Sequence, residues 1–395
     1  MVVRLADSIL SPLGFTTDAT YAAVKNGQSA VRAQTLGPCS FMGALLDRSG
    51  VSALFEAMAS RNKQADTASF TFFEKALVLS AYQAITQAGI DAAAPDTLFV
   101  VSTTKGNVSL LEGPTTDPTW EQACLGHSAQ CLTRFFGNPN DPIVVSNACI
   151  SGACAQITAL RALESGAYKT AVVTGADVLS PFIVSGFQSF KALSSTRCQP
   201  FDAHRTGLNL GEAAATLVYQ RPEPTPCALV GAPTTPRIHL LSGAIRNDAN
   251  HISGPSRTGE GLFNALQRTL EAGGIHQPAH QLAFINAHGT ATPYNDQMEA
   301  IALHRAGLER VPVNSLKAYF GHTLGAAGIL ETILSMRALE EGVVLPSLGC
   351  TTPDPVSPIA VAQTLQSLPL TQPRYAVKML SGFGGSNAAV LFGLL

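Results

Sequence analysis

Residues 143–166 read IVVSNACISGACAQITALRALESG, and this stretch decides the fold class. Its β-branched start predicts a short strand, the small residues that follow predict a tight turn, and the remainder predicts a buried helix that ends near Gly166. Residues 172–174, Val-Val-Thr, then predict a returning strand. Strand, small-residue turn, buried helix and strand in this order indicate a layered α/β fold.

The second half of the chain repeats this order of elements. Residues 161–166 read RALESG and residues 337–342 read RALEEG, so they differ at one position only, and residues 211–217 echo residues 385–391 at nearly the same spacing. A strand at 311–315, a small-residue turn at 321–328 and a helix at 329–341 complete the second copy. Chance similarity in an Ala- and Gly-rich chain is the alternative, but two echoes predict two related halves of about 175 residues each.

The boundary between these halves is expected in a proline-rich segment. Prolines at positions 222, 224, 226, 233 and 236 exclude a regular helix or a central strand there. We therefore expect an N-terminal half over residues 1–228 and a C-terminal half over residues 229–395.

The composition excludes several classes of protein. Only 13% of the 395 residues are charged and 46% are hydrophobic, which predicts a large buried body with further area hidden in an oligomer contact. With 25 basic and 27 acidic residues and no basic run, nucleic acid is not an expected partner. The eight cysteines lack C-x-x-C or zinc-type spacing, so we expect reduced thiols and no metal site.

No membrane segment is expected either. The uncharged stretch between Asp141 and Arg161 contains polar side chains that would need partners inside a bilayer, so we interpret it as buried in protein. Arg4 and Asp7 interrupt the N-terminal apolar run before it reaches the length of a signal-peptide core. The expected location is the cytoplasm.

Cys149 follows the first predicted strand and stands at or near the start of the next helix. Unpaired N–H groups at a helix N-terminus favour a thiolate and stabilise a developing oxyanion, so the position suits a nucleophile. A small apolar filler, as expected for Cys154, is the alternative.

Two histidines are candidate partners of this thiol. His288 follows a strand predicted at 283–286 and precedes Gly289, a common place for a catalytic imidazole and equally for a structural one. His322 lies in the second-half counterpart of the Cys149 turn. If the halves pack about a pseudo-twofold axis, equivalent turns face one site and bring Cys149 and His322 together.

Other polar residues near these turns have simpler expected roles. Lys317 precedes His322 in an uncharged neighbourhood and is expected to pair with Glu331, although solvated positions are the alternative for both. Asp296, in Asn-Asp-x-x-Glu over residues 295–299, is expected to be structural, within a helix N-cap whose glutamate reaches back.

Residues 381–387, SGFGGSN, form a glycine-rich loop with one large aromatic side chain. The loop lacks the spacing of a phosphate-binding loop. It could supply a backbone N–H to an oxyanion while Phe383 moves as a gate, or it could be an ordinary turn between strands.

Together these motifs resemble the elongating, Cys-His-His type of β-ketoacyl-[acyl carrier protein] synthase in the thiolase superfamily. The matching sequences are NACISG at 147–152, NAHGTATP-x-ND at 286–296, K-x-x-x-GH-x-x-GAAG at 317–328 and GFGGSN at 382–387, with PFD at 200–202 and GEAA at 211–214 as a fifth match. The resemblance implies a thiolase-like, five-layered αβαβα fold of two duplicated halves, and a homodimer.

The resemblance also implies a reaction. Cys149 would take an acyl chain from a carrier-protein thioester. His288 and His322 would hold the malonyl thioester carbonyl, assist decarboxylation and stabilise the enolate that attacks the acyl-cysteine. No cofactor would be bound, since the substrate brings the phosphopantetheine arm of acyl carrier protein.

Supporting roles follow from the same resemblance. Lys317, paired with Glu331, would order the site. The backbone N–H groups of the nucleophile and of Phe383 would form the oxyanion hole. Thr290 and Thr292 match positions that contact the phosphopantetheine arm.

Three departures leave the substrate open between fatty acid elongation and polyene or polyketide synthesis. Ile150 replaces a usual serine, the segment between Val101 and Cys149 looks short, and basic residues are sparse around residues 69–75, near the expected carrier-docking helix.

The sequence argues against three other functions. A degradative thiolase would need a second cysteine, and none lies between Gly382 and Leu395. An initiating synthase typically carries asparagine where His322 stands. A non-catalytic, chain-length-determining subunit of a heterodimer would lack the nucleophile that Cys149 provides.

Overall fold

The computed structural model describes the chain except residues 61–68, 114–116, 223–235, 355, 357 and 370–373. Its centre is a ten-stranded mixed sheet in the order β11-β10-β14-β15-β9-β1-β8-β6-β4-β5. The strands are β1 (Val2–Leu10), β4 (Thr97–Ser102), β5 (Ile143–Val145), β6 (Thr170–Asp177), β8 (Ala213–Gln220), β9 (Ile238–Asn247), β10 (Leu282–Asn286), β11 (Val313–Asn314), β14 (Arg374–Gly382) and β15 (Ser386–Leu394).

The sheet consists of two equivalent sets of five strands. From the middle outward, β1-β8-β6-β4-β5 pair antiparallel, antiparallel, parallel and parallel, and β9-β15-β14-β10-β11 pair in the same way. The two sets meet where Val2 and Val3 of β1 pair with Leu240 and His239 of β9. This pattern is the internal repeat expected from the sequence.

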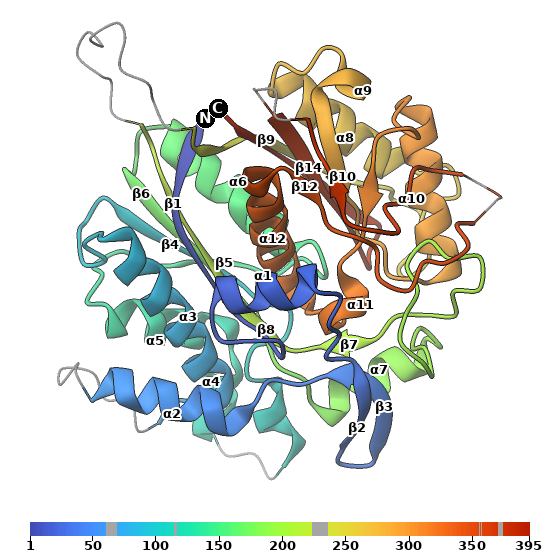
Figure 1. Ribbon diagram of the computed structural model, residues 1–395. Coiled ribbons are helices and arrows are strands. Elements are labelled where there is room, and N and C mark those ends of the chain that lie inside the picture. Colours follow the sequence, from blue (N-terminus) through green and yellow to red (C-terminus); the bar gives the residue numbers. More distant parts are fainter. Residues whose placement is uncertain (61–68, 114–116, 223–235, 355, 357, 370–373) are drawn as a thin grey trace, which may run out of the picture.

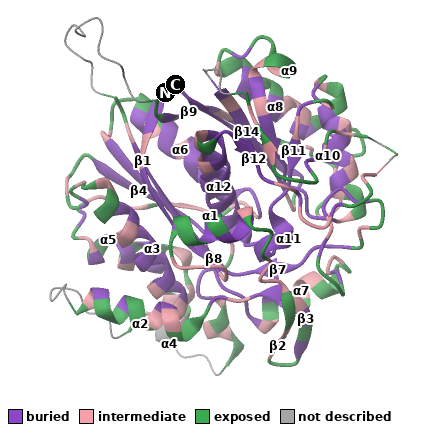
Figure 2. Cartoon of the chain, in the orientation of Figure 1, coloured by how far each residue is buried: buried purple, intermediate pink, exposed green. Residues whose placement is uncertain are grey.

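Two buried helices lie between the two sets of strands. They are α6 (Ser151–Glu164) and α12 (Ala327–Glu341), the helices that carry the RALESG and RALEEG echo. Figure 1 shows them at the centre of the molecule, and in Figure 2 both are coloured mostly as buried. Between them lies the buried side chain of Gln156, whose Nε2 donates to the carbonyl of Gly328 (2.9 Å).

Further helices cover the outer faces and complete five layers, αβαβα. Helix α3 (Phe72–Ala88) packs against the first set of strands, and α2 (Arg48–Ala59) and α5 (Leu125–Phe135) lie beside it. Helix α8 (Glu260–Ala272) packs against the second set, and α10 (Pro293–Arg305) lies beside it. The remaining elements are α1 (Thr17–Lys25), β2 (Arg32–Leu36), β3 (Cys39–Ala44), η1 (Val108–Glu112), α4 (Asp117–Ala123), α7 (Pro181–Ser189), β7 (Leu210–Gly211), α9 (Pro278–Gln281), α11 (Lys317–Phe320), η2 (Leu324–Ala326), β12 (Val343–Val344) and β13 (Gln366–Ser367).

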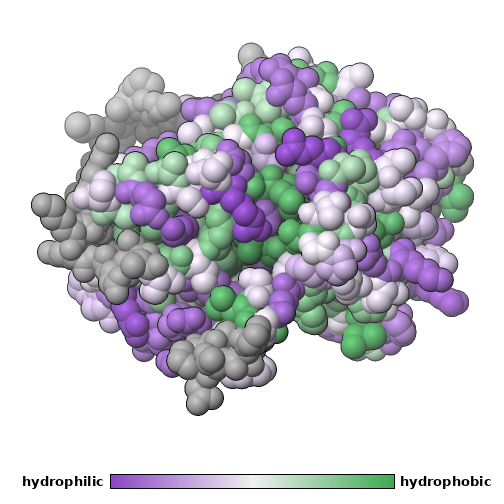
Figure 3. Space-filling view, turned by 90° about the horizontal axis from the view of Figure 1, so that it is seen from below, coloured by the Kyte–Doolittle hydropathy of each residue, from purple (hydrophilic) through white to green (hydrophobic). Residues whose placement is uncertain are grey.

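The expected boundary at residue 228 falls within residues 223–235, outside the described part of the chain. Within the described residues, no helix is long and apolar enough to span a membrane. On the face shown in Figure 3, hydrophobic residues gather toward the middle and hydrophilic residues are interspersed around them.

Candidate active site

Cys149 lies in the tight turn between β5 and α6. The hydroxyl of Ser151 accepts from the N–H of Asn147 (2.8 Å) and donates to the carbonyl of Ala148 (2.6 Å), which closes the turn. Ala148 has a φ of 43°, a left-handed conformation that is strained for a residue with a Cβ. The thiol, 7% exposed, therefore stands just before the helix N-terminus, as the sequence predicted.

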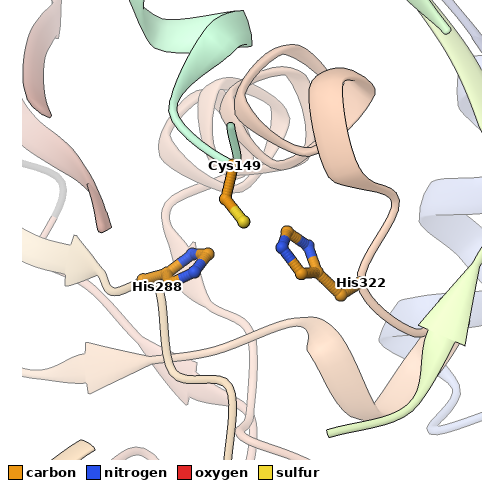
Figure 4. A group of neighbouring side chains, drawn as sticks. All are labelled: Cys149, His288 and His322. Carbon is orange, nitrogen blue, oxygen red and sulfur yellow. The ribbon is translucent and has the colours of Figure 1, made fainter. Parts of the chain in front are cut away.

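The structure brings both candidate histidines to this thiol. His288 follows the end of β10, and His322 follows α11. One ring nitrogen of each histidine and the sulfur all lie within 4.8 Å of one another, and the ring centroids are 5.1 Å apart. Figure 4 shows the thiol directed into the space between the two rings. The pseudo-twofold arrangement thus brings Cys149 and His322 together as expected.

Hydrogen bonds of the main chain hold each histidine. The buried carboxylate of Glu299 accepts from the N–H groups of His288 (2.7 Å) and Gly289 (2.6 Å). The N–H of His322 donates to the carbonyl of Asn209 (2.7 Å), and its own carbonyl accepts from Gly211 (3.0 Å). The imidazoles are thereby fixed through their backbones while the rings stay free for a ligand.

Several ring nitrogens have no hydrogen-bond partner. Both nitrogens of His322 and Nδ1 of His288 are buried and unpaired. Burial lowers the pKa of both rings well below the usual value, and the nearby Lys317 and Lys378 ammonium groups lower it further. The rings are therefore neutral at physiological pH and can each donate one hydrogen bond to a substrate oxygen.

The resting nucleophile is a thiol. Burial raises the pKa of Cys149 to about 11, against the opposing effects of the Lys317 ammonium and of the N–H of Phe383, which is hydrogen-bonded to the sulfur. This N–H belongs to the glycine-rich loop expected to contribute to an oxyanion hole. Formation of the thiolate therefore requires a nearby proton acceptor, and the two imidazoles are close enough for that.

Lys317 and Glu331 form the expected ion pair, with both side chains fully buried. A second lysine, Lys378 of β14, pairs with the other carboxylate oxygen of Glu331. Burial raises the pKa of a carboxyl, but the two ammonium groups hold that of Glu331 below its usual value. Lys378 was not predicted from the sequence, where its signal was a single lysine within the apolar run AVKML at residues 376–380.

A cavity of about 530 Å³ opens onto the three reactive groups. Thr290 and Thr292, which share a hydrogen bond of 2.9 Å, line it, as does Phe383. The Phe383 ring packs against Phe187 (5.7 Å between centroids) and Phe190 (5.2 Å). This aromatic cluster, which the sequence analysis did not predict, lies where a gate would stand.

The expected N-cap at residues 295–296 is wrong. The N-cap of α10 is Thr292, three residues before Asn295, and Pro293 stands in the first turn, where proline needs no N–H partner. The buried carboxylate of Asp296 instead accepts from the N–H groups of Phe201 (2.7 Å) and Ala291 (3.1 Å). Burial raises the pKa of Asp296 to about 6.

Asp177 at the end of β6 is a second polar residue that the sequence analysis missed. Its fully buried carboxylate accepts from the N–H of Thr104, from that of Lys105 (3.2 Å) and from that of Gly325 (2.6 Å). A loop of the first half is thereby fixed to the turn that follows His322. An aspartate after an apolar strand was its only signal in the sequence.

Two groups of possible metal ligands lie among the described residues, and we propose a metal at neither. The thiol and imidazoles lie near the buried ammonium groups of Lys317 and Lys378, which repel a cation. Glu74, His127 and Cys131 also lie close together, but both carboxylate oxygens of Glu74 already accept hydrogen bonds.

Comparison with known proteins agrees with this geometry. Residues 6–224 match the family described as beta-ketoacyl synthase, N-terminal domain, and residues 239–351 match the C-terminal domain of the same family. The 3-oxoacyl-[acyl-carrier-protein] synthase 2 of Staphylococcus aureus (strain COL) is 31% identical over 271 residues, which cover 64% of this chain. The match spans 61% of that relative's own length.

Solved structures share the fold over the whole chain. A β-ketoacyl synthase from Burkholderia phymatum STM815 is 26% identical with a TM-score of 0.84, covering 100% of this chain and 99% of that one. A chain from the complex of a ketosynthase with its chain length factor from Xenorhabdus doucetiae is 26% identical with a TM-score of 0.81, covering 100% and 98%. The expected thiolase-like fold is thus confirmed, and with a family match over more than half its length the chain belongs to the β-ketoacyl synthase family.

Proposed function

We propose that the chain catalyses the decarboxylative Claisen condensation of an acyl group held on Cys149 with malonyl-[acyl carrier protein]. The product is a β-ketoacyl-[acyl carrier protein] in fatty acid or polyketide biosynthesis, including polyene synthesis. The observation that carries the proposal is the grouping of one buried thiol and two neutral imidazoles on a cavity of about 530 Å³, with the sulfur and one nitrogen of each ring within 4.8 Å of one another.

The first step is acyl transfer. The sulfur of Cys149 attacks the thioester carbonyl of the acyl carrier, the carbon–sulfur bond of that thioester breaks, and the carrier thiol leaves with a proton. Because the resting thiol is protonated, an imidazole nitrogen accepts the thiol proton and then passes it to the leaving group. The N–H groups of Cys149 and Phe383 stabilise the oxyanion.

The second step is condensation. The neutral rings of His288 and His322 donate hydrogen bonds to the malonyl thioester oxygen while the carboxylate leaves as CO₂. The electron pair of the broken bond forms an enolate, whose carbon attacks the acyl-cysteine carbonyl. A carbon–carbon bond forms, the bond to sulfur breaks, and the released Cys149 thiolate takes a proton from water. Decarboxylation supplies the carbanion, so no strong base is needed.

Carrier recognition belongs to the same proposal. The hydroxyl groups of Thr290 and Thr292 line the cavity and suit the amide groups of a phosphopantetheine arm. Phe383, packed on Phe187 and Phe190, would move to admit the second substrate. No other cofactor is needed for the two steps.

We further propose a homodimer that acts in the cytoplasm, where thiols stay reduced. The similarity to a chain of a ketosynthase–chain length factor complex supports a heterodimer as the second arrangement. A non-catalytic role in such a pair would leave the thiol and both imidazoles of this site without a use.

The test is the intact mass of the protein after incubation with a panel of acyl-carrier thioesters. The wild type should gain an acyl group, Cys149→Ala should not, and malonyl carrier added afterwards should release a β-ketoacyl product two carbons longer. Cys154→Ala is the matched control, since that thiol lies on α6, the helix that follows Cys149, and its removal should leave the adduct unchanged. No adduct with any acyl chain, with or without a ketosynthase-like partner, would refute the proposal.

A further inference from the structure

Lys378 is a buried lysine to which none of the matched motifs gives a role. Its side chain, on β14, is fully buried, and its Nζ donates to the carbonyl oxygen of Ala287 (2.9 Å) and pairs with Glu331. Since the other oxygen of Glu331 pairs with Lys317, one carboxylate lies between two ammonium groups.

The contact with Ala287 holds the main chain next to His288. The carbonyl of Ala287 and the N–H of His288 belong to one peptide group, and the N–H donates to Glu299 (2.7 Å). Lys378 and Glu299 therefore hold this peptide group from its two sides. The orientation of the His288 ring depends on that peptide, because the ring itself has an unpaired Nδ1.

The charge of Lys378 is not needed to neutralise Glu331. Lys317 already pairs with that carboxylate, so the three ionised side chains leave one excess positive charge, and none of the three is exposed to solvent. An unbalanced buried charge costs free energy, so its presence beside the reactive groups points to a use in the site. The remaining charged group that faces Lys378 is the carboxyl of Glu299. Burial and the nearby Asp296 raise the pKa of Glu299 to about 7, so it offsets the positive charge only in part at neutral pH.

We propose that Lys378 is a positioning residue that orients His288 and supplies the excess positive charge beside which the malonyl thioester loses CO₂. The inference rests on the proposed function. In that step the bond between the carboxylate and the α-carbon breaks, and its electron pair becomes the enolate. The negative charge thus moves onto the thioester oxygen held by the imidazoles, and a fixed cation behind them stabilises it. The same charge also disfavours protonation of His288 and His322.

The test compares Lys378→Met with Lys378→Gln, which loses the charge but keeps a donor for the Ala287 carbonyl. Decarboxylation of malonyl carrier is measured in a Cys149→Ala background, so that no acyl-enzyme takes part. We expect Lys378→Met to decarboxylate about 100-fold more slowly, the effect of removing one positioned electrostatic group. Lys378→Gln should lose less. Acyl transfer, measured with Cys149 intact, should change by less than about threefold, because the nucleophile keeps its turn and its Phe383 contact.

Two readouts separate this role from a purely structural one. Without the cation, the pKa of His288 and His322 should rise. The loss of decarboxylation rate at acid pH, which follows their protonation, should therefore begin at a higher pH in both variants. The imidazole signals in NMR should titrate at correspondingly higher pH. Because a balanced Lys317–Glu331 pair remains, the unfolding midpoint should not fall in either variant. Met379→Leu, the next buried residue of β14, is the matched control and should change none of these values.

A folded Lys378→Met protein with the wild-type decarboxylation rate, loss of rate at acid pH and imidazole titration would overturn the inference. A wild type that neither gains an acyl group nor decarboxylates malonyl carrier would instead refute the proposed function. In that case the NMR titration still decides whether Lys378 sets the charge state of the two histidines.

Discussion

Gly152 of α6 and Gly328 of α12 lie in direct backbone contact where the two central helices cross. A Cβ on Gly152 would lie 2.9 Å from the Cα of Gly328, and a Cβ on Gly328 would lie 2.5 Å from the backbone nitrogen of Ala153. This close approach places the N-terminal ends of both helices at one point. Cys149 and His322, which precede the two glycines, are thereby held opposite each other.

Replacing Gly328 with alanine should therefore separate the two helix ends. The added methyl group meets backbone, which cannot rotate away, so we expect a loss of about 1–3 kcal/mol in the free energy of unfolding. Acyl transfer to Cys149 should fall by more than tenfold, because a displacement of about 1 Å in a reacting geometry has large effects on rate. Urea unfolding and the rate of adduct formation measure the two effects.

Gly126→Ala provides the control for that experiment. Gly126 is also helical, in α5, but a Cβ there meets nothing within 4 Å. Alanine should stabilise this helix slightly, by about 0.5–1 kcal/mol, without effect on acyl transfer. If Gly328→Ala were likewise stabilising and left acyl transfer unchanged, the close contact between the two halves would not be what holds the two turns together.

The sequence was sufficient to predict the contact between the two turns, for a physical reason. The RALESG and RALEEG echo marks α6 and α12 as equivalent, and equivalent helices packed about a pseudo-twofold axis bring their N-termini to one place. Cys149 and His322 both stand at such ends. Lys317 and Glu331 were predictable because a charge in an uncharged stretch needs a buried partner.

Other parts of the site could not be predicted from local sequence patterns. Lys378 and Asp177 act through partners far away in sequence, Glu331 and Gly325, and no spacing rule connects them. The N-cap of α10 was predicted at the wrong residue because the Asp296 carboxylate accepts a hydrogen bond from the N–H of Phe201, which is a tertiary contact. The duplicated core follows from the sequence pattern, whereas the polar contacts that cross it depend on the packed structure.

His322→Ala should impair decarboxylation more than acyl transfer. Neither ring nitrogen of His322 has a partner, so its one N–H can donate to a substrate oxygen, and loss of such a donor costs about 100- to 1,000-fold in rate. Acyl transfer retains His288 as a proton acceptor and should fall by less than about tenfold. Formation of acetyl carrier from malonyl carrier and formation of the Cys149 adduct report the two steps separately. Equal losses in both steps would contradict the division of roles.

Glu331→Gln should strongly destabilise the fold. It leaves Lys317 and Lys378 as two buried ammonium groups without a counter-charge, and breaking a buried ion pair in this way costs about 3–5 kcal/mol. The control is Glu271→Gln, which removes an exposed pair with Arg268 and should leave the urea midpoint unchanged. A Glu331→Gln midpoint equal to that of the wild type would mean that the lysines are not both charged.

The reactivity of Cys149 should increase steeply with pH well above neutrality. Burial raises the pKa of this thiol to about 11, and only the thiolate reacts with iodoacetamide, so each pH unit between about 7 and 10 should raise the alkylation rate about tenfold. The sign follows from the charged form being the one that burial disfavours. Peptide mapping by mass spectrometry separates Cys149 from the exposed Cys124, which serves as an internal reference within the same sample. A plateau in the Cys149 rate below pH 8 would show that the helix N-terminus and Lys317 outweigh burial, and the imidazoles would then not be needed to accept the thiol proton.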